Sequence, residues 1–215
     1  MDRDFWIDKW ETGVTGFHNA EPNRALVEHV DRLGLAPGAR VFVPLCGKTR
    51  DIGWLAGQGF RVCGVELSEL AVRALFEKLG VVPQRSERGA LVWYGAPGID
   101  IAVGDIFDLD RDALGPVEAI YDRAALVALP EGMRGRYAAH LKAMTGVVPQ
   151  LLVCFEYDRT AMDGPPFSVD AAQVRRFYGA EYDLTLLARS AVQGGLKGRC
   201  AADRAIWLLE RKDDG

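Results

Sequence analysis

The stretch from Arg40 to Glu66 constrains the fold more than any other part of this chain. Residues 40–44 form an apolar run typical of a strand, residues 45–48 (Leu-Cys-Gly-Lys) form a tight turn, and after a helical pattern a second strand ends at Glu66. A carboxylate about twenty residues beyond a glycine turn is where doubly wound nucleotide-binding folds hold ribose hydroxyls. Its two oxygens can accept hydrogen bonds from both hydroxyls of one ribose. The stretch therefore predicts an α/β fold with a nucleoside site.

The turn at residues 45–48 lacks the glycine pattern that binds a pyrophosphate. It has neither G-x-G-x-x-G nor the full P-loop spacing, because no glycine lies five residues before Gly47. A pyrophosphate normally requires such a glycine-rich turn at a helix N-terminus. The sequence therefore favours a nucleoside ligand without phosphates, of which S-adenosylmethionine is the common example. A NAD-dependent oxidoreductase is the weaker alternative.

Length, charge and cysteine usage exclude several classes of protein. The chain has 215 residues, 49% of them hydrophobic, which is enough for one well-buried domain. Its net charge of -4 argues against a nucleic-acid surface, and it has no apolar run of about 18 residues to span a membrane. The cysteines form no C-x-x-C pair, which argues against zinc and for reduced thiols. We expect a single domain over residues 1–215, a cytoplasmic monomer without a metal, acting on a small molecule.

Apolar strand-like runs alternate with helical patterns through most of the sequence. Several runs are continuously apolar, as in parallel strands that are covered on both faces. In the helical segment 69–79, Leu70, Ala74 and Leu75 share one face, which we expect to be buried. The expected strands are residues 41–44, 61–65, 99–103, 119–121 and 151–155, and the expected helices between them are residues 51–57, 69–79 and 133–144.

The two ends of the chain differ from this alternation. Residues 183–192 and 204–211 are strand-like and are joined by a glycine-rich loop too short for a crossover helix, so they should pair as an antiparallel hairpin. Residues 1–38 carry two short helical patterns, 5–11 and 23–33, which suit a cap over the site. A doubly wound, mostly parallel sheet closed by an antiparallel C-terminal hairpin is the Rossmann-like architecture of class I S-adenosylmethionine-dependent methyltransferases.

Seven short motifs, in order along the chain, carry a family resemblance. They are Phe5-Trp6-x-x-x-Trp10, Thr15-Gly16-Phe17-His18, Val43-Pro44-Leu45-Cys46-Gly47-Lys48 followed by Asp51, Val65-Glu66-Leu67-Ser68, Gly104-Asp105-Ile106-Phe107-Asp108, Tyr121-Asp122-Arg123-Ala124-Ala125-Leu126 and Gly164-Pro165-Pro166-Phe167. With these motifs the chain resembles the thiopurine S-methyltransferase family, bacterial members in particular. The resemblance runs from about Phe5 to the final strand.

The resemblance implies a set of cofactor contacts. It assigns Trp10, Leu45, Glu66 and Arg123 to S-adenosylmethionine, with Ile106 beside the adenine. From the residues themselves, Gly47 lets the backbone approach the amino-acid part of the cofactor, and Asp105 follows the third strand, where it can read the adenine edge. The planar fork of Arg123 suits either the cofactor carboxylate or an anionic acceptor, and the sequence leaves both roles open.

The resemblance also implies an acceptor pocket and an activity. Phe17, Pro166 and Phe167 resemble walls of that pocket, and a double proline makes a stiff loop that can present an apolar surface to a flat ring. Lys197 and Arg199, in the final hairpin loop, are candidates for a further acceptor contact. The implied reaction is S-methylation of thiopurines and related aromatic thiols, with selenium and tellurium oxyanions as further acceptors.

Several readings stay open at this stage. Glu66 could cap the next helix, although Ser68 suits that role better, and Arg123 could form a surface ion pair with Asp122. Asp122 is also a weak candidate for accepting a proton. Ser168 is the expected N-cap of a late helix, with Asp170 in its first turn. The alternative functions are a small-molecule methyltransferase with a different acceptor and a non-catalytic S-adenosylmethionine-binding protein.

Overall fold

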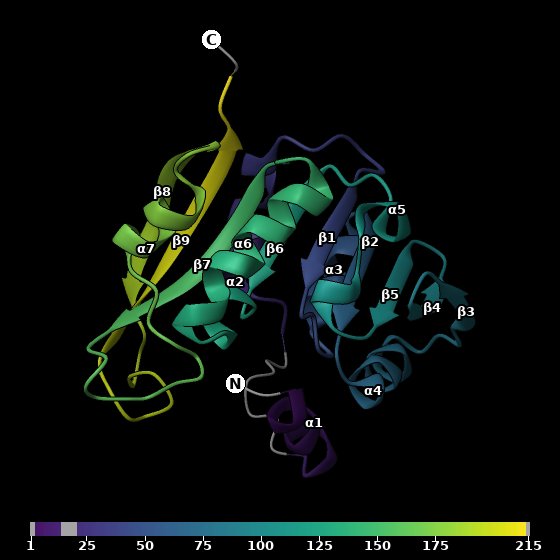
Figure 1. Cartoon of the computed structure of the whole chain (residues 1–215), viewed down its shortest axis with the longest axis horizontal. Coiled ribbons are helices and arrows are strands. Elements are labelled where there is room, and N and C mark those ends of the chain that lie inside the picture. Colours follow the sequence, from purple (N-terminus) through teal and green to yellow (C-terminus); the bar gives the residue numbers. More distant parts are fainter. Residues whose placement is uncertain (1–2, 14–20, 214–215) are drawn as a thin grey trace. The chain divides into compact units, whose positions relative to one another are not determined.

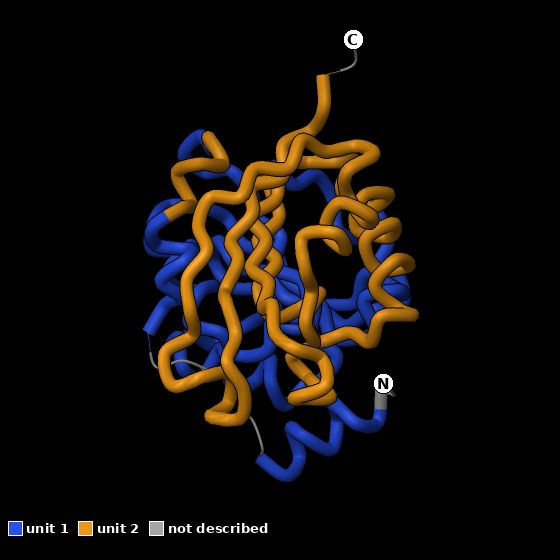
Figure 2. The backbone as a smooth tube through the Cα atoms, turned by 90° about the vertical axis from the view of Figure 1, so that its left-hand side faces the viewer, with its two compact units in different colours: residues 1–28, 35–118 blue, residues 29–34, 119–215 orange. Residues whose placement is uncertain are grey.

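The computed structural model describes residues 3–13 and 21–213. The chain divides into two compact units, drawn in different colours in Figure 2. The first unit comprises residues 1–28 and 35–118, and the second comprises residues 29–34 and 119–215. Each unit has its own strands and helices.

The strands of the first unit lie in the order β3-β4-β5-β2-β1 (Figure 1). Strands β1 (Arg40–Pro44), β2 (Arg61–Glu66) and β5 (Ile99–Val103) are parallel, with Pro44 opposite Val65 and Glu66 opposite Val103. Their carboxyl ends therefore meet at one edge of the sheet. Strands β3 (Gln84–Arg88) and β4 (Leu91–Ala96) form an antiparallel hairpin, and β4 pairs antiparallel with β5.

The helices of the first unit begin and end at residues with recognisable capping roles. Thr49 Oγ1 accepts a hydrogen bond from Asp51 N at 3.3 Å at the start of α3, and Gly80 ends α4 in the left-handed conformation with φ 69°. Each of these serves a terminus whose backbone groups lack partners within the helix. The helical segments are α1 (Arg3–Glu11), α2 (Arg24–His29, whose last residue belongs to the second unit), α3 (Arg50–Gly57), α4 (Glu69–Leu79), η2 (Ile106–Asp108) and α5 (Arg111–Leu114).

The strands of the second unit lie in the order β6-β7-β9-β8. Strands β6 (Ala119–Arg123) and β7 (Gln150–Tyr157) are parallel. Strand β9 (Ala202–Arg211) pairs antiparallel with both β7 and the edge strand β8 (Tyr182–Ala191), and the register of β8 shifts between Leu186 and Ala188. The predicted C-terminal hairpin and the predicted α/β class are confirmed, but the sheet is mixed rather than mostly parallel, because β3, β4, β8 and β9 all pair antiparallel.

The helices of the second unit pack on one another and on its strands. Helix α6 (Glu131–Thr145) contacts α7 (Ala171–Tyr178), and Figure 1 shows both helices in front of the strands of this unit. Two 3₁₀ turns complete the unit, η1 (Val30–Leu33) and η3 (Leu126–Ala128). No helix among the described residues is long and apolar enough to cross a membrane.

Four details differ from the sequence expectations. Leu70 of α4 was expected to be buried but is 53% exposed, because the helix buries the face that carries Ala71, Val72, Leu75 and Phe76. The β3–β4 hairpin was not predicted, and the helical pattern at 23–33 divides into α2 and η1. The expected N-cap of the late helix was wrong: Asp170 caps α7, accepting a hydrogen bond from Gln173 N at 2.8 Å. Ser168 instead bonds both backbone groups of Tyr157, each at 3.0 Å.

Candidate active site

The turn after β1 combines two left-handed residues with close packing. Leu45 has φ 45° and Gly47 has φ 55°, the first of which is uncommon for a residue with a side chain. Cys46 N donates to Val65 O at 3.1 Å, which ties the turn to β2. A Cβ on Gly64 would lie 3.0 Å from Cys46 Sγ and 3.1 Å from Val43 O, so β2 needs glycine there to approach the turn.

Glu66 lies at the carboxyl end of β2 and faces this turn. Its Oε2 accepts a hydrogen bond from Gly47 N at 2.9 Å, and its Oε1 accepts one from Ser68 N at 2.9 Å. The side chain is buried, with only 6% of its surface exposed. A carboxylate offers about four lone-pair positions, and these two backbone bonds fill two of them.

The environment of Glu66 acts on its charge in two opposing directions. Burial raises the pKa of this carboxyl above its ordinary value, while hydrogen bonds from the N–H groups of Ser68, Gly47 and Leu67 and from the Trp10 side chain lower it. Donors that bond the ionised form favour it. The carboxylate thus accepts hydrogen bonds from four donors in a place that water barely reaches.

Trp10 approaches this carboxylate from helix α1. The helix contacts α4 of the same unit. The half-buried Trp10 hydrogen bonds to Glu66, and Lys48 Nζ lies 5.4 Å from the centroid of the Trp10 ring. A cation at that distance over an indole is attracted by the ring. The site therefore includes Lys48, which belongs to the motif at residues 43–48 and had no role predicted from the sequence.

Asp105 and Ile106 follow β5, beside the end of β2. Gly104 N donates to Glu66 O at 3.0 Å, which joins the two strand ends. Asp105 caps η2 by accepting from Phe107 N through Oδ1 at 3.0 Å. The Ile106 side chain is only 3% exposed, so little of its surface is open to a ligand. Six of the residues that the sequence singled out for the cofactor thus lie in one unit: Trp10, Leu45, Gly47, Glu66, Asp105 and Ile106.

A hydrogen bond from a backbone N–H to a buried acid joins the start of α2 to α3 in this unit. Asn23 N donates to Asp51 Oδ1 at 2.7 Å, and Asn23 Oδ1 accepts from Ala25 N at 2.9 Å at the start of α2. Both Asn23 and Asp51 are buried. The sequence analysis gave Asp51 no role beyond its place in a motif. Its position as an acid in the first turn of a helix was the sequence signal for a structural role.

Arg123, the remaining predicted cofactor residue, lies in the second unit at the end of β6. Its neighbour Asp122 is fully buried and bonds elsewhere: Oδ1 accepts from Leu126 N at 3.1 Å and Oδ2 accepts from Tyr137 Oη at 2.8 Å. The surface ion pair considered for Asp122 and Arg123 is therefore wrong. Asp122 holds the turn that carries Arg123, and Ala124 in that turn has φ 66°.

Every residue from Pro165 to Ser168, in the loop with the double proline, forms a hydrogen bond with another segment of the second unit. Phe167 N donates to Val127 O at 2.6 Å, which ties the loop to η3 and so to the turn that carries Arg123. Tyr157 Oη donates to Pro166 O at 2.7 Å and Lys197 Nζ donates to Pro165 O at 2.6 Å. The second unit thus connects Arg123, Pro166 and Phe167 through backbone hydrogen bonds.

The other residues expected to contact the methyl acceptor differ in where the structure places them. Lys197 of the hairpin loop contacts the proline loop through its ammonium group, whereas Arg199 is exposed and its backbone N donates to Leu196 O at 3.0 Å. Phe17 lies outside the described residues. Sequence reasoning did not identify Arg134 and Tyr137, whose side chains are buried on α6.

The chain is similar to known proteins over nearly its whole length. A profile of the thiopurine S-methyltransferase family matches residues 1–212. The chain is 58% identical over 212 residues to a thiopurine S-methyltransferase of Xanthobacter autotrophicus, covering 98% of this chain and 100% of that protein. It is 53% identical to one of Gluconobacter oxydans over 203 residues, covering 94% of this chain and 92% of the other.

Solved structures show the same fold at low identity. Magnesium protoporphyrin IX methyltransferase from Synechocystis, with bound S-adenosylmethionine, matches with a TM-score of 0.66 at 17% identity over 98% of both chains. 1,6-Didemethyltoxoflavin N1-methyltransferase from Burkholderia thailandensis matches with a TM-score of 0.64 at 17% identity, over 97% of this chain and 87% of the other. These likenesses confirm the Rossmann-like methyltransferase fold, and the profile and the close relatives show that the chain belongs to the thiopurine S-methyltransferase family.

Proposed function

We propose that this protein is an S-adenosylmethionine-dependent S-methyltransferase that acts on thiopurines and related aromatic thiols. The observation that carries the proposal is the Glu66 carboxylate, held between Gly47 N and Ser68 N at the end of β2. The names of the relatives in Xanthobacter and Gluconobacter support the acceptor class. The protein works as a monomer in the cytoplasm, as one functional domain with residues 1–38 as a cap.

The residues of the first unit suit S-adenosylmethionine in their chemistry. Glu66 accepts the two ribose hydroxyls, because it lies at the end of the second strand, where doubly wound nucleotide-binding folds place a ribose-binding acid. Asp105 and Ile106 flank the adenine, and the backbone of Leu45 and Gly47 lies against the amino-acid part. Trp10 covers the methionine end and excludes water. When bound, the cofactor supplies a methyl group on a positively charged sulfur.

The acceptor requires positioning more than proton transfer. An aromatic thiol is substantially ionised near neutral pH and is strongly nucleophilic, so the protein must mainly align the sulfur with the methyl carbon. Asp122 is not a suitable base, because it is fully buried and both of its oxygens already accept hydrogen bonds. Arg123 stabilises the anionic acceptor, and Pro166 and Phe167 form an apolar wall for its ring. An apolar pocket also favours a step in which charge is lost.

Turnover measurements test this proposal directly. The purified protein is mixed with S-adenosylmethionine and 6-mercaptopurine, and S-adenosylhomocysteine is quantified against a control without acceptor. Acceptor-dependent product is expected. Product only with tellurite, selenite or other thiols would replace the acceptor class, whereas binding of S-adenosylhomocysteine without any turnover would favour a non-catalytic binding protein. Absence of binding would overturn the methyltransferase proposal.

Arg123→Gln separates the two roles of Arg123. If the guanidinium serves the acceptor, the KM for 6-mercaptopurine rises by roughly tenfold or more, the range for a lost hydrogen bond to a charged group, and the Kd of S-adenosylhomocysteine stays within about twofold. A weakened S-adenosylhomocysteine complex would assign Arg123 to the cofactor carboxylate instead. Arg136→Gln, an exposed arginine on α6, is the matched control.

A further inference from the structure

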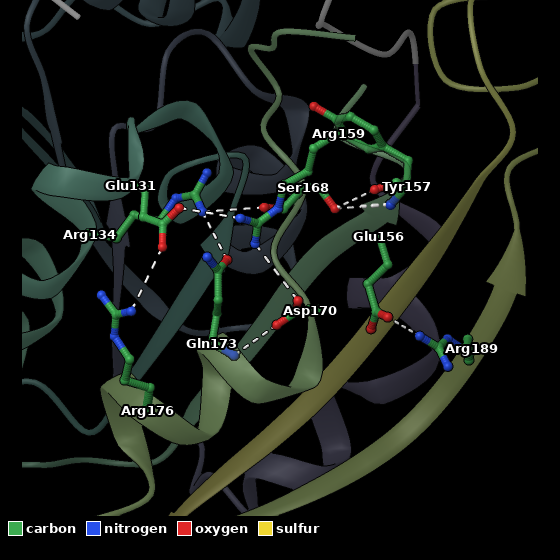
Figure 3. Close-up of polar contacts among 10 residues, drawn as sticks. All are labelled: Glu131, Arg134, Glu156, Tyr157, Arg159, Ser168, Asp170, Gln173, Arg176 and Arg189. Carbon is green, nitrogen blue, oxygen red and sulfur yellow. Dashed lines mark hydrogen bonds and ion pairs between the residues drawn. The ribbon is translucent and has the colours of Figure 1, made fainter. Parts of the chain in front are cut away.

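Arg134 is a buried cation on α6 whose side chain is only 2% exposed. Its Nε donates to Leu129 O at 2.9 Å, and its Nη1 donates to Ser168 O at 3.2 Å and to Gln173 Oε1 at 2.9 Å. Figure 3 shows Arg134 among Ser168 and Gln173 at the centre of this group. These acceptors are neutral oxygens, two carbonyls and one amide. Burying a charge costs free energy, and none of these acceptors is charged. The burial of Arg134 therefore has an explanation other than an ion pair.

The surrounding ion pairs are more exposed than Arg134. Glu131 lies 3.3 Å from Arg159 and 3.7 Å from Arg176, and Arg159 lies 3.7 Å from Asp170. The side chains in these pairs are about half exposed, and such pairs contribute little to stability. Figure 3 shows them around the Arg134 contacts. The buried guanidinium is therefore the specific feature of this region.

Arg134 contacts the proline loop at two points. Its guanidinium carbon lies 5.4 Å from the centroid of the Phe167 ring, and its Nη1 bonds the carbonyl of the next residue, Ser168. The first contact attracts the ring face and the second fixes the backbone that carries the ring. Leu129 and Gln173, which hold the other N–H groups, lie outside the loop, on the segments after η3 and in α7.

We propose that Arg134 is a positioning residue for the methyl acceptor, which holds Phe167 and Ser168 so that the loop presents a fixed apolar wall to a flat aromatic thiol. The inference rests on the proposed function, because it assigns the acceptor to this loop. Arg134 acts through Phe167 rather than on the reacting atoms. Lysine cannot reproduce the role, since a single ammonium lacks the planar fork that reaches three acceptors at once.

Arg134→Lys is the first test, with Arg136→Lys as the matched control on the exposed side of the same helix. We expect the KM for 6-mercaptopurine to rise by roughly fivefold or more in Arg134→Lys, as for the loss of one or two hydrogen bonds, with a smaller change in kcat. The Kd of S-adenosylhomocysteine and the KM for S-adenosylmethionine should stay within about twofold of wild type. The control should leave all four quantities unchanged.

A double-mutant cycle with Phe167→Leu tests whether Arg134 acts through the ring. Because the two residues touch, their effects on the acceptor KM should not add, and Arg134→Lys should change little once Phe167 is replaced. If Arg134→Lys does not fold, Gln173→Ala removes one of the acceptors of Arg134 from α7 and should raise the same KM without weakening S-adenosylhomocysteine binding.

The outcomes separate this inference from the proposed function. An active wild type whose acceptor KM is unchanged in both Arg134→Lys and Gln173→Ala would overturn the positioning role alone. Equal losses of acceptor and cofactor binding would also overturn it, since they would indicate general loosening. A wild type that methylates no thiol would overturn the proposed function, and the inference with it.

Discussion

The Glu66 carboxylate accepts hydrogen bonds from two backbone N–H groups, those of Gly47 and Ser68. These bonds shape the turn after β1, and an acid at this strand end is also where nucleotide-binding folds hold ribose hydroxyls. The sequence presented ribose binding and helix capping as alternatives. In the structure Ser68 is the N-cap residue of α4 but its side chain makes no capping hydrogen bond, and Glu66 bonds the backbone N–H of Ser68.

Glu66→Ala should weaken S-adenosylhomocysteine binding by about 1.5–3 kcal/mol, the range for hydrogen bonds to a charged group. Titration calorimetry measures the change. Glu77→Ala, which removes an exposed acid from the neighbouring helix α4, is the control and should bind as wild type. Equal affinity in wild type and Glu66→Ala would remove Glu66 from the cofactor site.

Asp122 makes stability depend on pH in a direction opposite to that of a salt-bridged acid. Burial raises its pKa from 3.8 to about 6, against the opposing hydrogen bonds from Leu126 N, Tyr137 Oη and Ala125 N. Between those two values the folded chain binds more protons at this site than the unfolded chain. The free energy of unfolding therefore falls as the pH rises through this window.

Asp122→Asn should remove this slope, because an amide does not titrate and can still accept from Leu126 N. Relative to the variant, wild type should lose up to about 3 kcal/mol of unfolding free energy between pH 4 and pH 6. Urea unfolding at several pH values measures the difference, with Asp183→Asn on the exposed face of β8 as control. Parallel curves for wild type and Asp122→Asn would contradict the assignment.

Among the elements, α7 shows how a helix start is decided by geometry. Asp170, two residues after the expected cap Ser168, accepts a hydrogen bond from Gln173 N. The Ser168 hydroxyl instead bonds the backbone N–H and carbonyl of Tyr157. Both residue types favour N-caps, so sequence preference could not choose between them. The pairing of Ser168 with β7 settled the choice.

Asp170→Ala should lower the free energy of unfolding by about 1 kcal/mol, the usual loss when an N-cap is removed. Asp170→Asn keeps a capping oxygen and gives up only the distant ion pair with Arg159 at 3.7 Å, so it should stay close to wild type. Chemical denaturation of the three proteins gives the comparison. Equal losses in both variants would mean that the ion pair, rather than the cap, stabilises the helix.

Element prediction failed where the pattern of apolar residues does not show which side chains are buried. Strand β3 (Gln84–Arg88) is polar and exposed throughout, and only its pairing with β4 makes it a strand. Within α4, Leu70 was expected to be buried but is 53% exposed, whereas Ala71, Val72, Leu75 and Phe76 form the buried face. Apolar residues occupy most of that helix, so periodicity alone could not fix the orientation.

At the scale of the whole molecule, ligand binding should appear as thermal stabilisation. S-adenosylhomocysteine at about 100 times its Kd adds about 2.7 kcal/mol to the folded state, which corresponds to a rise in Tm of roughly 5–10 °C for a chain of this size. Differential scanning calorimetry measures the shift. At the same ligand concentration Glu66→Ala should show a much smaller rise, and equal shifts would contradict the proposed cofactor site.

The sequence by itself determined the α/β class, the C-terminal hairpin, the family and the position of Glu66. These depend on local patterns: apolar runs, a glycine turn, and an acid at a strand end. Tertiary structure alone decided that Asp122 is a buried anchor, that Asp170 caps α7 and that Arg134 contacts the proline loop. Asp122 bonds Tyr137, Arg134 bonds Ser168, and Asp170 caps α7 because Ser168 is bonded to Tyr157. These partners lie far apart in sequence, and no local pattern encodes them.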